Sequence, residues 1–508
     1  MKKRAAALLA YVPTAVQNSQ VTLDSAPTVD INWWNSMVKL TFYGGVGEIG
    51  GNKILLEDGD CRIFLDFGVS FSRRSKYFEE FLPPRTANGI GDFLATNLIP
   101  DIRGVYREDL LVHLGRKPEE PEISGVILSH AHADHANYIS FLHEDIPVYC
   151  GKTCKAVLDA VNEQSRRNIE NEIVDFKRRP IIPGKRDEPI KRKFVLFRTG
   201  DKLLIDSVEI EPVHVDHSVP GAYGFIIYTS EGAVVYTGDF RMHGTNPELT
   251  IDFIEKAKEA KPIAMITEGT RIHERKGDES EEKVYIKAKA ELEKARGLSV
   301  IDFNFKDVDR VRTFYRIARE MDKFLVISFK HACFLERYHR DEKLDVPDSR
   351  DDHILLLKPK MRTGTYADYD YMSEPYIKSR LNYPNIITAE EISKKPENYI
   401  VVLNYWYFTT LIDLKPEKGI YIHSLSEPFN EEMEISFERM MEWLKLFNLK
   451  YVHAHCSGHA YGDDIIGMIN EIKPKEVYPI HTERPDMFAN LSTKTIQVEE
   501  NKTYRIGG

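Results

Sequence analysis

The sequence feature that most constrains this chain is a short apolar stretch that ends in a cluster of histidines and an aspartate. Residues 126–128 have the composition of a buried strand, and the pattern H-x-H-x-D-H follows almost at once. Imidazole and carboxylate groups together suit borderline divalent metals such as zinc. Histidines can also cluster on a surface by chance, but chance does not readily place four metal-capable side chains directly after a buried strand. The four, enough for two ions, are His130, His132, Asp134 and His135.

Composition gives bounds but names no function. Among the 508 residues, 42% are hydrophobic and 29% charged, as in ordinary soluble proteins, and the length allows two to four domains. The net charge of −10 does not argue for nucleic acid, yet a local basic face would suffice to bind it. Five scattered cysteines do not form a disulfide framework. No apolar run is long enough to span a membrane, so a cytoplasmic location is expected.

The N-terminal segment differs from the rest of the chain. Its basic start and short apolar part resemble a signal peptide only weakly, and no convincing cleavage site follows. Folded-domain patterning begins at Val38. Residues 1–37 are therefore expected to be a disordered extension, or to result from a start codon assigned too early.

A glycine-rich loop after the first strand contains a literal G-x-G-x-x-G, at Gly45, Gly47 and Gly50. A dinucleotide-binding fingerprint requires a helix directly after it. Here the residues from 53 to 65 predict a strand, a turn and a second strand, so the nucleotide interpretation fails. Asp66 ends the second strand, a suitable position for a carboxylate that braces a metal site.

Three later strand-type segments repeat the pattern of a functional side chain at a strand end. His217, Asp239 and Glu268 each lie at or near the carboxyl end of such a segment. In layered α/β proteins, active sites gather at these ends. From about residue 274 the pattern changes to alternating helices and strands, which indicates a second α/β domain that continues to about residue 421.

The order of these motifs resembles the metallo-β-lactamase superfamily. The insertion, the S-G-H-A segment at 457–460 and the P-I-H-T-E segment at 479–483 are similar to the β-CASP nucleases. The closest resemblance is to the ribonuclease J type, in its archaeal form without a C-terminal domain. It implies an α/β fold: a metallo-β-lactamase αββα sandwich with an inserted β-CASP α/β domain. The expected boundaries are 38–273 and 422–508 for the sandwich and 274–421 for the insertion.

The resemblance also implies roles for individual residues. One zinc ion would be held by His130, His132 and His217, a second by Asp134, His135 and His481, and Asp239 would bridge both. Manganese or magnesium could replace zinc. Glu268 would orient His459, the proton donor, so that Asp134, Asp239, Glu268 and His459 form the catalytic set. His455 and Ser457 would grip a phosphate together with His459.

The chemistry agrees with this expectation. Two ions ~3.5–4 Å apart can clamp the attacking and leaving oxygens of a phosphodiester and supply hydroxide near neutral pH. The expected function is therefore a zinc-dependent ribonuclease, a 5′→3′ exonuclease and/or an endonuclease, acting on single-stranded RNA by a two-metal hydroxide mechanism. A homodimer is left open.

Three alternatives remain. A DNA nuclease of the same superfamily is disfavoured because His481 stands where the DNA-repair branch usually has valine. A small-molecule (thio)ester or lactone hydrolase would leave the insertion without a role. A non-catalytic scaffold conflicts with the complete set of ligand positions.

Several segments depart from the family pattern or stay open. Residues 403–408 carry aromatic side chains in place of the expected G-x-Q-G-E-P, and they are predicted to be core rather than a base-stacking platform. The basic segment 166–198 fits a solvated face or a surface that steers a polyanion. The 78–111 insertion could guard the cleft.

Overall fold

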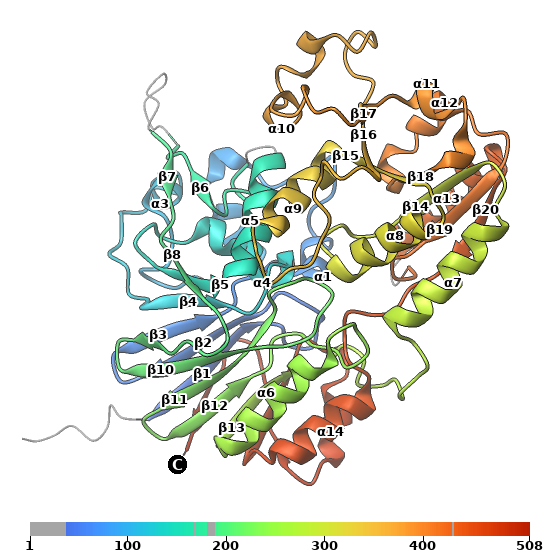
Figure 1. The fold of residues 1–508 in the computed structure, drawn as a ribbon. Helices are drawn as coiled ribbons and strands as arrows, with labels where there is room; N and C mark the ends of the chain where they lie inside the picture. Colours follow the sequence, from blue (N-terminus) through green and yellow to red (C-terminus); the bar gives the residue numbers. More distant parts are fainter. Residues whose placement is uncertain (1–36, 166–167, 180–187, 429–430, 508) are drawn as a thin grey trace, which may run out of the picture. The chain divides into compact units, whose positions relative to one another are not determined.

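The computed structural model describes residues 37–507 except 166–167, 180–187 and 429–430. The N-terminal extension considered in the sequence thus lies almost wholly outside the described residues. Strands of the described part form three seven-stranded sheets and one two-stranded sheet. Figure 1 shows their arrangement.

The first two sheets pack face to face. The first has the order β23 (Thr503–Ile506), β1 (Val38–Gly44), β2 (Lys53–Asp58), β3 (Cys61–Leu65), β4 (Gly125–Leu128), β5 (Val148–Gly151), β8 (Phe194–Phe197). The second has the order β22 (Lys494–Thr495), β21 (Glu476–Ile480), β13 (Ala264–Glu268), β12 (Gly232–Tyr236), β11 (Tyr223–Thr229), β10 (Val208–His214), β9 (Leu203–Ile205). One hydrophobic core joins their inner faces.

Helices cover both outer faces of this pair. Helix α5 (Lys152–Gln164) packs on the first sheet, and α6 (Pro247–Glu259) and α14 (Gly462–Ile472) pack on the second (Figure 1). Val157 and Leu158 of α5 and Phe253 of α6 are buried there. These four layers are the αββα sandwich predicted from the sequence, which is therefore confirmed.

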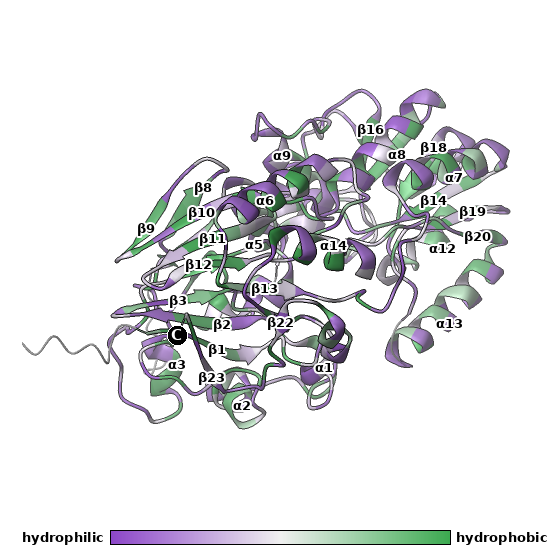
Figure 2. Cartoon of the chain, turned by 90° about the horizontal axis from the view of Figure 1, so that it is seen from below, coloured by the Kyte–Doolittle hydropathy of each residue, from purple (hydrophilic) through white to green (hydrophobic). Residues whose placement is uncertain are grey.

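The third sheet is parallel throughout. Its order is β17 (Ile386–Ile387), β16 (Ile354–Leu357), β15 (Phe324–Ser328), β18 (Tyr399–Val402), β14 (Leu298–Asp302), β19 (Gly419–His423), β20 (Leu449–His453). Its main helices are α7 (Glu281–Lys294), α8 (Val308–Glu320), α9 (Phe329–His339) and α13 (Glu431–Leu446). Figure 2 shows alternating hydrophobic and hydrophilic turns along α13, as expected for a helix with one buried face.

This sheet extends further along the chain than the predicted insertion. β20 pairs in parallel with β19 from Gly419↔Leu449 to His423↔His453, although it lies beyond the expected boundary at 421. We therefore propose that the inserted domain begins near residue 274 and ends after His453.

Shorter elements complete the described chain: α1 (Phe71–Arg74), α2 (Gly91–Ala95), α3 (Glu108–Val112), α4 (Ala133–Ala136), α10 (Pro375–Lys378), α11 (Ala389–Ile392), α12 (Thr410–Leu414), β6 (Asp175–Phe176) and β7 (Ile190–Lys191). The short 3₁₀ helices are η2 (Thr86–Asn88), η3 (Asn137–Phe141), η4 (Asp368–Tyr371), η5 (Pro396–Asn398), η6 (Tyr405–Tyr407) and η7 (Pro485–Asn490). None of the described helices has both the length and the apolar character that a bilayer crossing demands.

Candidate metal centre

The predicted ligands come together because parallel strands end at a common edge. β3 pairs in parallel with β4 in the first sheet, and β12, β13 and β21 are parallel neighbours in the second. The chain leaves these strands with side chains aimed into one space between the sheets. They are Asp66 after β3, His130 to His135 after β4, Asp239 after β12, Glu268 at the end of β13 and His481 after β21.

The glycine-rich loop seats the turn that carries Asp134. The backbone N–H groups of Gly51 and Asn52 donate to the Asp134 carbonyl at 3.0 and 3.1 Å. Gly50 has φ +78°, and a Cβ there would lie 2.6 Å from the Asp134 carboxylate. Only glycine fits both the left-handed backbone and this close approach. The pattern that fails as a nucleotide fingerprint is thus a structural part of the metal centre.

Three histidines and one aspartate form the first ligand group: His130, His132, His217 and Asp239. His132 Nδ1 lies 3.0 Å from His130 Nε2 and 3.2 Å from His217 Nε2. The Nδ1 of His217 is 2.6 Å from the Gly458 carbonyl, so the Nδ1–H donates there and Nε2 is left to face the group. Burial lowers the pKa of His132 to about 4 and those of His130 and His217 well below the ordinary range. Neutral imidazole is the form that binds a metal ion.

The second group consists of Asp134, His135 and His481. His481 Nε2 lies 3.3 Å from Asp134 Oδ2, and its other ring nitrogen lies 2.9 Å from the Thr270 hydroxyl. Asp239 Oδ2 lies between the two groups, 3.1 Å from His135 Nε2 and 3.6 Å from His481 Nε2. It is also 3.7 Å from His130 Nε2. Asp239 is therefore the side chain shared by both groups.

The donor atoms fit divalent cations. His135 Nε2 and Asp239 Oδ1 are buried, and neither has a hydrogen-bond partner among the described residues. Such buried unpaired atoms are rare unless an ion or water satisfies them. Burial opposes protonation of His135, but Asp239, Asp66 and Asp134 hold its pKa well above the ordinary value. The group therefore carries a surplus of negative charge that a cation would neutralise.

Asp66 lies behind the second group, as the sequence predicts. Its Oδ2 is 2.7 Å from His135 Nδ1 and accepts the Tyr236 hydroxyl at 2.5 Å, while Oδ1 accepts the Ser129 N–H at 2.7 Å. All four side chains are buried. The contact to Nδ1 leaves His135 Nε2 facing the ligand group, which is how carboxylates commonly orient metal-binding histidines.

Glu268 and His459 form a carboxylate–imidazole pair next to the first two ligand groups, and with Asp239 and His481 they make up a third group of metal-capable side chains. His459 Nδ1 lies 3.0 and 3.1 Å from the two Glu268 oxygens and 3.9 Å from Asp239 Oδ2. Glu268 is fixed in turn by the N–H groups of Phe240 and Thr270. Burial opposes protonation of His459, yet Glu268 and Asp239 raise its pKa to about 9. A protonated imidazole at this position can donate a proton.

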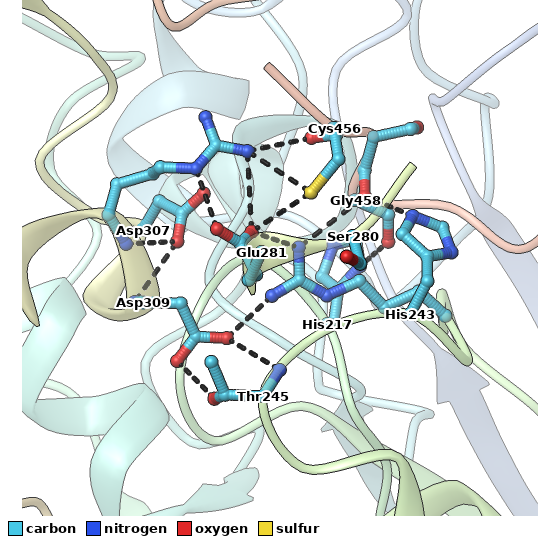
Figure 3. A network of polar contacts seen from close by, with 12 residues as sticks. His217, His243, Thr245, Ser280, Glu281, Asp307, Asp309, Cys456 and Gly458 are labelled. Carbon is cyan, nitrogen blue, oxygen red and sulfur yellow. Dashed lines mark hydrogen bonds and ion pairs between the residues drawn. The ribbon is translucent and has the colours of Figure 1, made fainter. Parts of the chain in front are cut away.

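The segment from His455 to His459 is anchored by a buried polar network. We call it the arginine network; it consists of Arg241, Glu281, Asp309, Arg310 and their partners (Figure 3). Arg241 donates to Glu281 at 2.9 Å and to Asp309 at 2.7 Å, and Arg310 donates to Glu281 at 2.8 Å. The carbonyl groups of Ser457 and Cys456 accept from Arg241 and Arg310 at 3.4 and 3.0 Å. The network therefore joins the sandwich, the α7–α8 region and the segment that carries His459.

His455 and Ser457, the predicted phosphate contacts, lie in this segment but in none of the ligand groups. His455 Nδ1 is 3.2 Å from Arg310 Nη1 and 3.2 Å from the Ser424 carbonyl. A neutral imidazole Nδ1 accepts from the guanidinium in one tautomer and donates to the carbonyl in the other. Burial and Arg310 lower the pKa of His455 to about 3. The Ser457 hydroxyl accepts the His459 N–H at 3.1 Å.

The basic segment is largely ion-paired where it is described. Arg178 pairs with Glu144, and Arg179 lies 2.8 Å from Glu172. Arg192 is buried and donates to backbone carbonyls at 2.7 and 2.6 Å. Arg166, Arg167, Lys185 and Arg186 lie outside the described residues. The described part supports a structural role rather than steering of a polyanion.

Sequence reasoning did not identify several residues that shape the site. They are Gly50, Tyr236, Thr270, Lys306 and the members of the arginine network. Tyr236 and Thr270 were within reach of such reasoning, because each adjoins a predicted ligand strand. Lys306 and Arg310 follow β14 of the third sheet, and no local pattern links that strand to the histidine cluster.

Comparisons with known proteins agree with this architecture. Residues 96–271 match a family model described as a β-lactamase superfamily domain, and residues 441–501 match a Zn-dependent metallo-hydrolase RNA specificity domain. A ribonuclease J of Helicobacter pylori strain J99 is 22% identical over 473 residues, which cover 88% of this chain and 56% of that protein. The chain thus spans about half the length of this relative.

Two further matches cover nearly the full length both of this chain and of the other protein. A ribonuclease J of Pyrococcus abyssi is 21% identical over 502 residues, covering 93% of this chain and 94% of that protein. A crystal structure of an Enterococcus faecalis V583 protein of unknown function matches with TM-score 0.69 and 24% identity, over 92% of this chain and all of that one. The fold, the paired family matches and the relatives agree, and together they support a metallo-β-lactamase architecture of the ribonuclease J-like β-CASP type.

Proposed function

We propose that the chain is a metal-dependent ribonuclease that hydrolyses phosphodiester bonds of single-stranded RNA. The observation that carries the proposal is the convergence of seven metal-capable side chains from distant parts of the sequence on one buried space. One zinc ion would be held by His130, His132 and His217 and another by Asp134, His135 and His481. Asp239, which lies within reach of both groups, would be shared by the two ions.

When bound, two such ions supply an activated water and neutralise the charge that grows on the phosphoryl oxygens. The protein's own residues do the rest. Asp66 and Thr270 fix the ring orientations of His135 and His481. Glu268 holds His459 in its protonated form, from which it would donate a proton to the leaving oxygen. His455 and the Ser457 hydroxyl would bind a neighbouring phosphate.

RNA is favoured over the other substrates by one specific observation. Residues 441–501, which include His455, Ser457, His459 and His481, match a model described as an RNA specificity domain. The relatives that span most of this chain are named ribonuclease J. A DNA substrate or a small (thio)ester has no comparable support. Exonuclease or endonuclease action, dimerisation and a cytoplasmic location stay predictions.

The test is a cleavage assay with matched substrates. The full chain, loaded with zinc or manganese, is offered 5′-labelled single-stranded RNA, DNA of the same sequence and a thioester. We expect cleavage of RNA, with the product ladder distinguishing stepwise 5′→3′ removal from internal cuts. Asp239→Asn should abolish it, and His459→Ala should reduce it about 10²-fold or more. His339→Ala is the matched control, because His339 is exposed and belongs to none of the ligand groups. Thioester turnover with intact RNA would overturn the proposal.

A further inference from the structure

A short aromatic turn projects from the third sheet. Residues Tyr405–Tyr407 form η6 directly after β18, and Trp406 and Tyr407 are 75% and 48% exposed. Phe408, next in the chain, is only 2% exposed and packs in the core with Tyr421. The sequence prediction that these aromatics are core is therefore confirmed for Phe408 and wrong for Trp406 and Tyr407. Trp406 and Tyr407 are neighbours in the chain, and adjoining exposed apolar side chains can mark a contact surface where single ones do not.

The turn is held in a fixed conformation. Asn404 caps η6 by accepting the Trp406 N–H at 3.0 Å, and the Leu403 N–H donates to Ile301 of β14 at 2.9 Å. Tyr405 packs against both Trp406 and Phe408, with ring centroids 5.2 and 5.6 Å apart. The exposed rings thus stand on a rigid base, which limits the entropy that binding would cost.

A lysine accompanies the exposed rings. Lys330, near the start of α9, donates to the Tyr407 hydroxyl at 3.0 Å, and its ammonium group lies 5.7 Å from the ring centroid. An aromatic face beside a cation matches the two parts of a nucleotide, a flat base and a phosphate. A peptide partner would gain less from a planar ring beside a positive charge.

The turn lies at the carboxyl edge of the third sheet, beside the loop that carries Lys306. β18 runs between β15 and β14, all parallel, so residues 403–407, 329–331 and 303–307 follow adjacent carboxyl ends. Phe305 stacks on His331 at 4.2 Å with an interplanar angle of 2°, which joins two of these loops. In open α/β sheets, ligands bind along this edge.

Lys306 links the edge to the ligand groups. Its charge interacts with Asp134 and His132. Within the described part of the chain, its ammonium group has no hydrogen bond or ion pair. Cationic and aromatic side chains therefore gather along this edge: Lys306, Phe305 with His331, and Lys330 with Tyr407 next to Trp406.

We propose that Trp406 and Tyr407, together with Lys330, form a stacking platform for a base of single-stranded RNA whose scissile phosphate lies at the metal centre. Lys306 contacts the sugar–phosphate backbone between the two sites. This inference rests on the proposed ribonuclease function and adds a binding site outside the metal centre. The platform recognises any base, because stacking uses the π-face that all bases share.

The experiment measures binding of fluorescein-labelled single-stranded RNA to the metal-loaded His459→Ala protein, which is expected to bind without cleaving. In this background, Trp406→Ala should weaken binding about tenfold, within the range for one lost stack, and Trp406→Phe should restore most of it. The matched control is Phe324→Ala, a 36% exposed aromatic at the amino end of β15. Because that side chain lies at the opposite edge of the sheet, its removal should change affinity less than twofold.

Single abasic nucleotides, placed one at a time along the RNA, identify the stacked base. The His459→Ala protein should lose affinity at one position of the scan, and the protein that also carries Trp406→Ala should be insensitive there. Unchanged affinity in Trp406→Ala, or an equal loss in Phe324→Ala, would overturn the platform while wild-type RNA cleavage upholds the ribonuclease. Absence of both RNA binding and RNA cleavage would overturn both proposals.

Discussion

Two clusters of buried charge lie close together in this protein and differ in how they are neutralised. The metal centre combines the carboxylates of Asp66, Asp134, Asp239 and Glu268 with imidazoles, and it contains buried atoms without partners. The arginine network pairs the guanidinium groups of Arg241 and Arg310 with Glu281 and Asp309. The arginine network is almost completely removed from solvent, whereas Asp134 and His459 of the metal centre keep 18% and 21% of their side-chain surface exposed.

This difference shows which of the two clusters is suited to bind a cation that the chain itself does not supply. In the arginine network the cations are part of the chain, and its two arginines are fully charged at any pH. In the metal centre, Asp239 Oδ1 and His135 Nε2 have no hydrogen-bond partner among the described residues. A buried cluster whose carboxylates meet the chain's own arginines serves structure, whereas one whose carboxylates meet imidazoles can serve binding of a cation.

The largest expected effect comes from Asp239, the side chain shared by both ligand groups. Asp239→Asn should lower RNA cleavage by about 10⁴-fold or more, since it removes charge that holds both ions. The bound metal, measured by elemental analysis, should fall as well. Chelation should lower the melting temperature of the wild-type protein but hardly that of the variant. Full metal content in the variant would contradict the assignment.

Breaking the arginine network should affect stability without affecting metal content. Arg241→Ala leaves Glu281 and Asp309 buried with fewer cations, and removal of one partner of a buried pair typically costs about 3–5 kcal/mol. Urea unfolding of the metal-loaded protein measures this loss. Arg316→Ala provides the comparison, because its pair with Glu320 is exposed and should contribute less than about 1 kcal/mol. Equal losses in the two variants would remove the distinction between the clusters.

His459 lies beside the ligand groups but should act by proton transfer rather than by metal binding. His459→Ala should reduce cleavage of RNA about 10²-fold or more while the metal content is kept. A p-nitrophenyl phosphodiester, whose leaving group needs no proton, should show a much smaller loss. If both substrates lose activity equally, His459 positions the metal site instead.

The smallest expected effect is a pH dependence of the arginine network. Burial opposes ionisation of Glu281, but Arg310 and Arg241 lower its pKa to about 2, from an ordinary value of 4.5. A folded-state pKa below the unfolded value stabilises the protein above pH 4.5, and this contribution is lost as the pH falls toward 2. Glu281→Gln should remove roughly 2 kcal/mol of this dependence, as measured by urea unfolding from pH 6 to pH 3. If the free energy of unfolding of Glu281→Gln fell between pH 6 and pH 3 as much as that of the wild type, the two arginines would not lower the pKa of Glu281.

The sequence predicted the sandwich and most of the metal centre because both leave local signals. A strand followed within two residues by H-x-H-x-D-H is visible in a ten-residue window, and His217, Asp239 and His481 each follow a strand of their own. The alternation of helices and strands after residue 274 was anticipated for the same reason, since the periodicity of each segment is local. The end of the third sheet was not anticipated, because the pairing of β20 with β19 depends on a partner 30 residues away in register.

The arginine network left no signal in the sequence. Arg241, Glu281, Arg310 and Cys456 are separated by tens to more than a hundred residues, and only the folded chain brings them into contact. The exposure of Trp406 was equally hidden, since an aromatic run after a strand has the same composition whether it packs inward or stands on a capped turn.

The sequence by itself determined the chemistry that this protein can perform, because the types of metal-binding side chain and the strands that end at them are encoded in short segments. The tertiary structure alone decided how that chemistry is supported: which carboxylate orients which imidazole, which buried charges are balanced, and which aromatic rings meet the solvent. The physical reason is that burial and pairing depend on contacts between segments far apart in the chain. Periodicity within a segment carries no information about them.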